Sequence, residues 1–370
     1  MQRTFLLGAG FSKAVADGPL MSEIWEYIEK AYEREKSRTV LGLNNRLEWF
    51  KELDNFVKEF EEEATFGFNQ KEFDKIRVGI KENLEYLFTV IDLHTQENGP
   101  KIEFGRKGVD ISPYPVIPFR FIGKDRLEET KRCLLTFLYI IFENLKGNNK
   151  DNEFGKIISE KDQIITFNYD LVLEKALWQR NIWSPLNGYV GVDKFAKEDD
   201  KKKLEEANKY SRIKIHKMHG SICWVKSDHS EHILIKLDNK ENWGFHFDGL
   251  EKMLEREPTG QFEGQISKGY VGKHDPPWML PSFVKPFERK EFYEIWKSAL
   301  KVMSKTDELI IIGYSFRPED SNSQLLIASL PDECNLILID RHPEKIKERL
   351  EKKGLKIKTI HNSLQHYLST

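Results

Sequence analysis

The sequence Arg3-Thr4-Phe5-Leu6-Leu7-Gly8-Ala9-Gly10-Phe11-Ser12, near the start of the chain, is the strongest indication of how the protein folds. A short apolar run leads straight into a glycine turn, and a serine hydroxyl follows two residues after the second glycine. In a parallel α/β sheet, a first strand passes into a helix in this way, and the N-terminus of that helix can hold a phosphate. Because glycine has no Cβ, the turn can be tight and can approach an anion closely. The stretch therefore predicts a nucleotide-binding turn.

The composition is that of a large protein with little net charge. Of its 370 residues, 58 are Lys or Arg and 60 are Asp or Glu, which gives a formal net charge of −2. Such a balance creates no basic field that would attract nucleic acid. The three cysteines lie far apart in the sequence, as in proteins of a reducing compartment. No apolar run approaches the ~20 residues that a membrane span needs. We expect a cytoplasmic protein that binds neither nucleic acid nor membrane directly.

Apolar strands alternate with helical segments along the chain. After the first strand, the patterns predict a helix over 14–36 and then strands over 163–167, 214–218, 308–312 and 335–339. Strands and helices in alternation predict a doubly wound, Rossmann-like parallel sheet with right-handed crossovers.

The spacing of the strands also predicts how the chain divides. The section between the first two strands is too long for one crossover, and its composition is helical. We therefore expect a helical insertion subdomain at 37–160 within a Rossmann domain formed by 1–36 and 161–370. A smaller irregular insertion is expected at 225–285.

Each predicted strand ends in small or polar residues that could do chemistry. These ends are Gly8 to Ser12, Asn168 to Asp170, His219-Gly220, Gly313 to Ser315, and Asp340. In open α/β sheets, ligands bind at the carboxyl ends of the strands, near the point where the strand order reverses. We expect these groups to converge on one crevice.

The order of the motifs resembles the sirtuin family, and more closely its bacterial NAD-hydrolase branch. Sirtuins carry Gly-Ala-Gly-x-Ser on the first loop, as at 8–12 here, and Thr-x-Asn-x-Asp after a central strand, as at 166–170. His-Gly at 219–220 matches the segment with the active-site histidine, and Gly-x-Ser at 313–315 matches a late strand end. Four such motifs in this order form a far more specific signal than any one of them.

The chain also departs from the deacylase branch of the resemblance. Three cysteines cannot build the four-cysteine zinc ribbon of a deacylase. The usual Pro-Asp-Phe-Arg segment is absent, and Phe167 stands where a glutamine is common. These differences argue against acyl-lysine as co-substrate and leave the NAD-cleaving core intact.

The resemblance implies an NAD+ glycohydrolase that uses NAD as substrate, without a metal. Cleavage of the bond between nicotinamide and ribose passes through an oxocarbenium-like transition state, so the site must orient the ribose and place a water. The amide of Asn168 suits that task, and His219 suits a general base. Asp170 would hold the nicotinamide carboxamide, completing the catalytic set. The residues expected to bind the nucleotide are Gly8, Ala9, Gly10, Phe11, Ser12, Thr166, Gly313, Ser315 and Asp340.

Other interpretations of the same motifs remain open. One is a non-catalytic NAD or ADP-ribose sensor that gates a partner, and another is an NAD-dependent ADP-ribosyltransferase or deacylase. A zinc site at His216, His219 and Cys223 is disfavoured, because residues 216 and 219 of a strand point to opposite faces. By resemblance, a hydrolase of this kind is an effector of bacterial antiphage defence that drains NAD in abortive infection. Such an enzyme needs restraint, from a homo-oligomer or from a co-encoded regulatory protein.

Overall fold

The computed structural model describes residues 2–37, 51, 53–55, 57–58, 88, 124–180, 182–183, 188–192, 194–195, 213–226, 233–235, 279, 290–316 and 322–369. The chain divides into two compact units. One contains 1–20, 142–279 and 286–370, and the other contains 21–141 and 280–285. The insertions expected at 37–160 and 225–285 lie largely outside the described residues, and the boundaries expected for them stay predictions.

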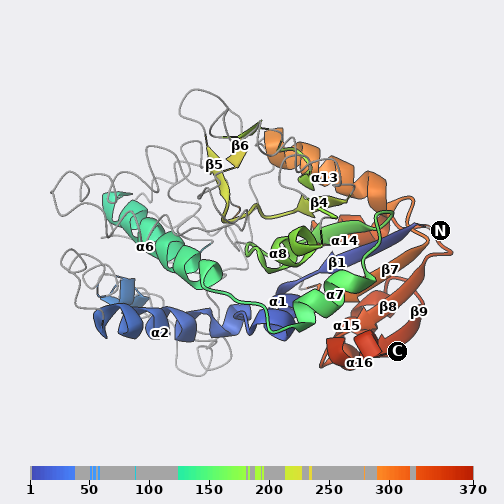
Figure 1. Cartoon of the computed structure of the whole chain (residues 1–370), viewed down its shortest axis with the longest axis horizontal. Coiled ribbons are helices and arrows are strands. Elements are labelled where there is room, and N and C mark those ends of the chain that lie inside the picture. The colour runs from blue at the N-terminus through green and yellow to red at the C-terminus, as the bar shows by residue number, and fades with distance from the viewer. Residues whose placement is uncertain are drawn as a thin grey trace, which may run out of the picture. The chain divides into compact units, whose positions relative to one another are not determined.

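A six-stranded parallel sheet forms the centre of the first unit, in the order β4-β2-β1-β7-β8-β9. The strands are β1 (Arg3–Leu7), β2 (Gln163–Thr166), β4 (Lys214–Lys217), β7 (Glu308–Ile312), β8 (Asn335–Ile339) and β9 (Ile357–His361). The chain starts in the middle, adds two strands on one side of β1, and then returns to add three on the other (Figure 1). This is the doubly wound Rossmann-like order, with its switch point between β1 and β7. The predicted fold class is confirmed.

Helices cover both faces of this sheet, as a parallel sheet requires. One group, whose members pack on one another, comprises α1 (Ala9–Ala16), α7 (Lys150–Ile157), α8 (Val172–Gln179) and α16 (Leu364–Ser369). The other comprises α13 (Lys290–Met303), which packs on β4 and α14 (Ser323–Ala328), and α15 (Pro343–Glu351), which packs on β8 and β9. Right-handed crossovers in this strand order place the groups on opposite faces. Phe154 of α7 packs edge-on against both Phe5 and Phe11, so the side chain of Phe11 belongs to the core.

The remaining described elements are smaller or belong to the second unit. A three-stranded sheet of the first unit has the order β3-β6-β5, from β3 (Lys194–Phe195), β5 (Trp224–Lys226) and β6 (Ile233–Ile235). The second unit contains η1 (Met21–Glu23), α2 (Ile24–Ser37) and most of α6 (Lys124–Glu143). Among the described helices, none combines the length and the apolar character needed to cross a membrane.

Two elements differ from the sequence expectation. The helix expected over 14–36 is two helices, because α1 starts directly after Gly8 and ends at Asp17, which has a left-handed φ of 52° and precedes Gly18-Pro19. Proline cannot continue the helix, so α2 starts afresh at Ile24. The sheet also continues beyond the strand at 335–339, which we expected to be the last one. The added strand β9 is half-exposed, as an edge strand is, and carries no continuous apolar run.

Three glycines allow β1 and β7 to meet at the switch point. Gly8 donates its amide hydrogen to Ile312 O and Gly10 donates to Gly313 O, both at 3.0 Å. Gly313 has φ +59°, and a Cβ added to it would lie 2.4 Å from the Cα of Gly10. A Cβ on Gly8 or Gly10 would likewise lie 2.5–2.6 Å from backbone atoms of Gly313. The glycines of this turn are therefore required for the close packing of the backbones of β1 and β7, whether or not the turn also binds an anion.

Replacing Gly313 by alanine is expected to destabilise the protein more than a matched replacement elsewhere. Gly354 also has a left-handed φ, +80°, but a Cβ added there meets nothing within 4 Å. Gly354→Ala should therefore cost only the backbone strain, about 1–2 kcal/mol. Gly313→Ala adds a clash with backbone, which cannot move aside as a side chain can. Thermal unfolding of both variants checks this, and equal melting temperatures would contradict the backbone contact.

Candidate functional site

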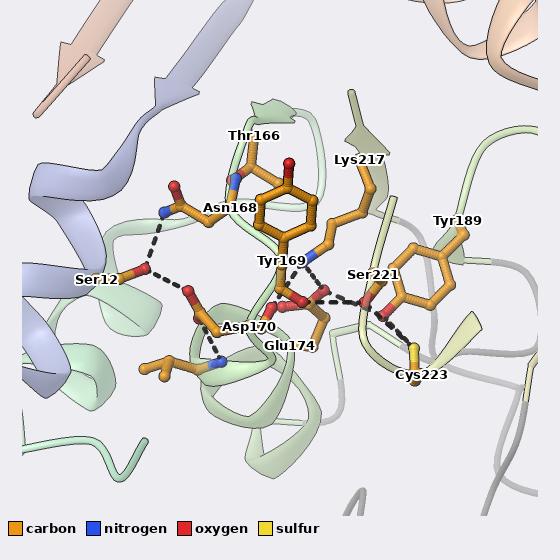
Figure 2. A network of polar contacts seen from close by, with 11 residues as sticks. Ser12, Thr166, Asn168, Tyr169, Asp170, Glu174, Tyr189, Lys217, Ser221 and Cys223 are labelled. Carbon is orange, nitrogen blue, oxygen red and sulfur yellow. Dashed lines mark hydrogen bonds and ion pairs between the residues drawn. The ribbon is translucent and has the colours of Figure 1, made fainter. Parts of the chain in front are cut away.

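A chain of hydrogen bonds joins the ends of β1 and β2 at the carboxyl edge of the sheet. The Ser12 hydroxyl donates to Asp170 Oδ2 at 2.6 Å and accepts from Asn168 Nδ2 at 2.9 Å. The same Asn168 nitrogen donates to Gly8 O at 2.9 Å. Figure 2 shows Ser12 standing between the two side chains. The glycine turn after β1 and the Asn-Tyr-Asp segment after β2 thus form one polar unit.

The orientation of the Asn168 side chain is determined by these bonds. Gly8 O can only accept, so the atom facing it must be the amide nitrogen. Both hydrogens of that nitrogen are used, one by Gly8 O and one by the Ser12 hydroxyl. The carbonyl oxygen of Asn168 is therefore held on the side away from Ser12, as Figure 2 shows. A group held in this way can accept a hydrogen bond from a hydroxyl or a water without rearranging.

The side chain of Asp170 forms the end of this chain of hydrogen bonds. Its side chain is buried, and while Oδ2 accepts from Ser12, Oδ1 accepts from the amide of Val172 at 3.0 Å. The second bond caps the first turn of α8, where a negative charge is favourable. Both carboxylate oxygens are thus engaged within the protein. In this geometry Asp170 positions the hydroxyl of Ser12, whose single hydrogen points at it.

His219 lies after β4, in an aromatic environment next to this unit. The buried imidazole packs edge-on against Phe167 at 5.0 Å between ring centroids, and is tilted on Tyr169 at 5.9 Å. Phe167 in turn stacks on Tyr314, which follows β7, at 4.3 Å. His219 therefore contacts the two neighbours of Asn168 in sequence. The strand ends of β4, β2 and β7 meet through these rings.

Backbone hydrogen bonds hold the same loops together. Phe167 N donates to Leu7 O, and Met218 N donates to Thr166 O, which extends the sheet pairing one residue past each strand. The buried hydroxyl of Thr166 accepts from Asn168 N at 3.2 Å. Thr166 therefore supports the turn that leads to Asn168 from beneath.

Three further residues predicted to bind the nucleotide, Ala9, Ser315 and Asp340, lie outside this hydrogen-bonded unit. Ala9 is exposed at the first position of α1, and Ser315 is exposed after β7. Ser315 O accepts from the guanidinium of Arg349 at 2.7 Å. Asp340, after β8, accepts from the amide of His342 at 2.8 Å and so shapes its own loop. All three follow the carboxyl ends of strands, as predicted, but the described contacts do not link them to Asn168.

Sequence reasoning missed a buried charged cluster behind the site. Lys217 is 1% exposed and pairs with Glu174, itself 0% exposed, at 2.8 Å. Tyr189 donates to the same Glu174 oxygen at 3.0 Å and contacts Cys223. Burial raises the pKa of Glu174 against the opposing effect of Lys217, and burial raises the pKa of Cys223 to about 11. The sequence alone does not reveal this cluster, because Lys217 is a charged residue at the end of β4 and its burial depends on Glu174.

His216 and His219 have different surroundings in the structure. The His216 ring bonds to Ile164 O at 3.2 Å and to the Ser298 hydroxyl at 3.0 Å, beneath α13. His219 faces Phe167 and Tyr169 instead. In the part of the chain that the structure describes, no group of three or more His, Cys, Asp or Glu side chains is arranged to hold a metal ion.

The sheet order and the site at its switch point define a doubly wound, Rossmann-like protein. Residues 162–360 match the SIR2-like domain family, which is more than half of the chain, so the protein belongs to that family. Eighteen chains of solved structures also match. One is a Sir2 mutant with a p53 peptide and NAD, at 11% identity and a TM-score of 0.35, covering 68% of this chain and 83% of that one. No curated protein matches the sequence significantly.

The buried His216 is expected to make the fold sensitive to acid. Burial lowers its pKa from 6.5 to about 4. Between those values the unfolded chain binds a proton that the folded one does not, so stability falls as pH drops from about 6.5 to about 4. The loss from this group is about 3 kcal/mol. Denaturant unfolding from pH 7 to 4.5 should show a shallower decline for His216→Gln than for the wild type. The exposed His366→Gln is the control, and equal slopes for all three proteins would contradict the assignment.

Proposed function

We propose that this protein is an NAD hydrolase that releases nicotinamide and ADP-ribose. The observation that carries the proposal is the Asn168 carbonyl, held by Gly8 and Ser12 at the switch point of the sheet. Dinucleotides bind at this place in doubly wound folds. Membership of the SIR2-like family supports an enzyme that uses NAD.

The proposed reaction suits a site without a strong acid. Nicotinamide leaves the ribose as a neutral ring from a cationic one, and the transition state carries positive charge on the ribose. The enzyme must hold the ribose, stabilise that charge and direct a water to the anomeric carbon. The oxygen of Asn168 would accept from a ribose hydroxyl or from the water. Because the oxygen is already held in place, no reorganisation is needed at the moment of reaction.

His219 would act as the general base on the water or on a ribose hydroxyl. Imidazole is the side chain whose ordinary pKa lies closest to neutral pH. Its ring packs on Phe167 and Tyr169, which precede and follow Asn168 in the sequence. The imidazole of His219 and the amide of Asn168 are therefore supported by the same segment. Asp170 would act by positioning Ser12 and Asn168, beside the contact to the nicotinamide carboxamide that the sirtuin resemblance implies.

The diphosphate would lie at the N-terminus of α1. The amides of Gly8 and Gly10 donate to the last residue of β7 and to the residue after it, so the exposed Ala9 is the position where the turn could approach a phosphate. The positive end of the helix dipole favours an anion there. Ser315 would contact the diphosphate from the side of β7. Asp340 would accept from a hydroxyl of the adenosine ribose, as an acid after a later strand does in this fold class.

The sequence supports hydrolysis over deacylation. A chain with three cysteines has no set of four for the zinc ribbon that a sirtuin deacylase uses. Phe167, which replaces the common glutamine, is stacked on Tyr314 beside His219. Compared with an acyl-lysine, water is the acceptor of the ADP-ribosyl group that needs no further binding site on the protein.

Nicotinamide release from NAD by the purified protein tests this proposal. Asn168→Ala and His219→Ala should each lower kcat by about a hundredfold or more, because each removes a group that acts in the transition state. Asn362→Ala and His366→Ala replace the same residue types at exposed positions and should leave the rate unchanged. Undiminished turnover in either site variant would refute the site. Tight NAD binding without turnover in the wild type would favour a sensor.

We further propose that the enzyme drains cellular NAD as an effector of antiphage defence, restrained by self-association or by a co-encoded protein. Expression of the active enzyme in bacteria should then lower total NAD and stop growth, and Asn168→Ala should abolish both effects. Extracted nucleotides measured over time after induction check this. If the wild type leaves NAD unchanged alone, during phage infection and with neighbouring genes present, the role as a depleting effector is wrong.

A further inference from the structure

We propose that Lys217 is a positioning residue that holds the Asn168–Asp170 segment in its active geometry. The inference rests on the proposed NAD hydrolase function and deepens it. Lys217 is the last residue of β4, two residues before His219, and its side chain crosses to the segment that follows β2. Its ammonium donates to Asp170 O at 2.6 Å and pairs with Glu174 at 2.8 Å, as Figure 2 shows.

A second contact holds the neighbouring carbonyl of the same segment. Tyr169 O accepts from Ile222 N at 3.1 Å and from the Ser221 hydroxyl at 3.5 Å. The carbonyls of Asp170 and Tyr169 are thus held by the last residue of β4 and by the connection that follows it. Because Asn168 directly precedes them, these bonds limit how far its backbone can turn. A displacement of about 1 Å in such a group can lower a rate by up to a hundredfold.

Met279 adds a link between the same two loops. Its amide donates to His219 O at 2.9 Å, and its carbonyl accepts from the Tyr169 hydroxyl. Met279 therefore joins the loop that carries His219 to the segment that carries Asn168. Lys217 is the charged member of this connection, and it is almost completely buried.

The charge itself points to positioning rather than to stability. A buried ion pair is often no more stabilising than an apolar pair of similar volume, since both ions lose their hydration. An apolar pair, however, could not donate to Asp170 O. The ammonium has three hydrogens, so it can satisfy Glu174 and Asp170 O together. Glu174 supports this arrangement by compensating the charge, with Tyr189 as a further donor.

Two variants separate an effect on positioning from an effect on folding. One removes the anchor, which is the hydrogen bond from Lys217 to Asp170 O, and the other keeps it but removes the partner charge of Lys217. The double variant Lys217→Met, Glu174→Leu removes both charges and the donor to Asp170 O together, so no buried charge is left unpaired. The Tyr189 hydroxyl loses Glu174 but keeps its contact with Cys223, and the double variant should be less destabilised than Lys217→Met alone. Glu174→Gln keeps the lysine and its bond to Asp170 O but leaves a buried cation without its partner charge. It should therefore unfold at a lower temperature while retaining the anchor.

We expect the double variant to lose at least tenfold in kcat with little change in KM, and Glu174→Gln to keep kcat near wild type below its melting temperature. Hydrogen exchange in a peptide covering 167–172 should be faster only in the double variant. A double variant with wild-type kcat and wild-type exchange would overturn the proposal. If the wild type releases no nicotinamide, the proposed function fails alone, and the exchange measurement still decides whether Lys217 holds the segment.

Discussion

At the switch point of the sheet, the backbones that follow β1 and β7 approach each other so closely that only glycines fit. Gly10 and Gly313 are in van der Waals contact through main-chain atoms, and no side chain fits between them. This contact brings the loop after β1 against the loop after β7. It leaves Gly8 O facing the end of β2, where it accepts a hydrogen bond from the side-chain amide of Asn168. A larger residue at any of these glycines would move that acceptor.

From that contact, a continuous set of interactions crosses the sheet in strand order. It passes from Gly313 after β7 to Gly10 after β1, then through Ser12 and Asn168 to the end of β2. Lys217 carries it on to β4 through Asp170 O. Four neighbouring strands thus support one polar side chain. This explains how groups separated by about 300 residues, such as Gly10 and Gly313, are held to within hydrogen-bond distance.

Much of this was accessible from the sequence, for a physical reason. Strands buried on both faces read as continuous apolar runs, and the residues that follow them must gather at one edge. Hence the sheet and the meeting of Ser12, Asn168 and Asp170 could be predicted. The edge strand β9 could not, because it is half-exposed and lacks such a run. The buried Lys217 and Glu174 were missed because a charged residue is ordinarily solvated, and only its partner makes burial possible.

The glycine turn illustrates a further limit of sequence reasoning. The amides of a Gly-x-Gly turn can donate hydrogen bonds to an anion or to a neighbouring backbone. Here the amides of Gly8 and Gly10 donate to Ile312 O and Gly313 O. The motif is thus structural first, and any phosphate contact is shifted toward Ala9. Because Ser12, Asn168 and Asp170 also form one hydrogen-bonded unit, the effects of replacing them should not add. Each of these side chains is therefore held by its neighbours, and the chain of bonds between them would act as one unit in the proposed reaction.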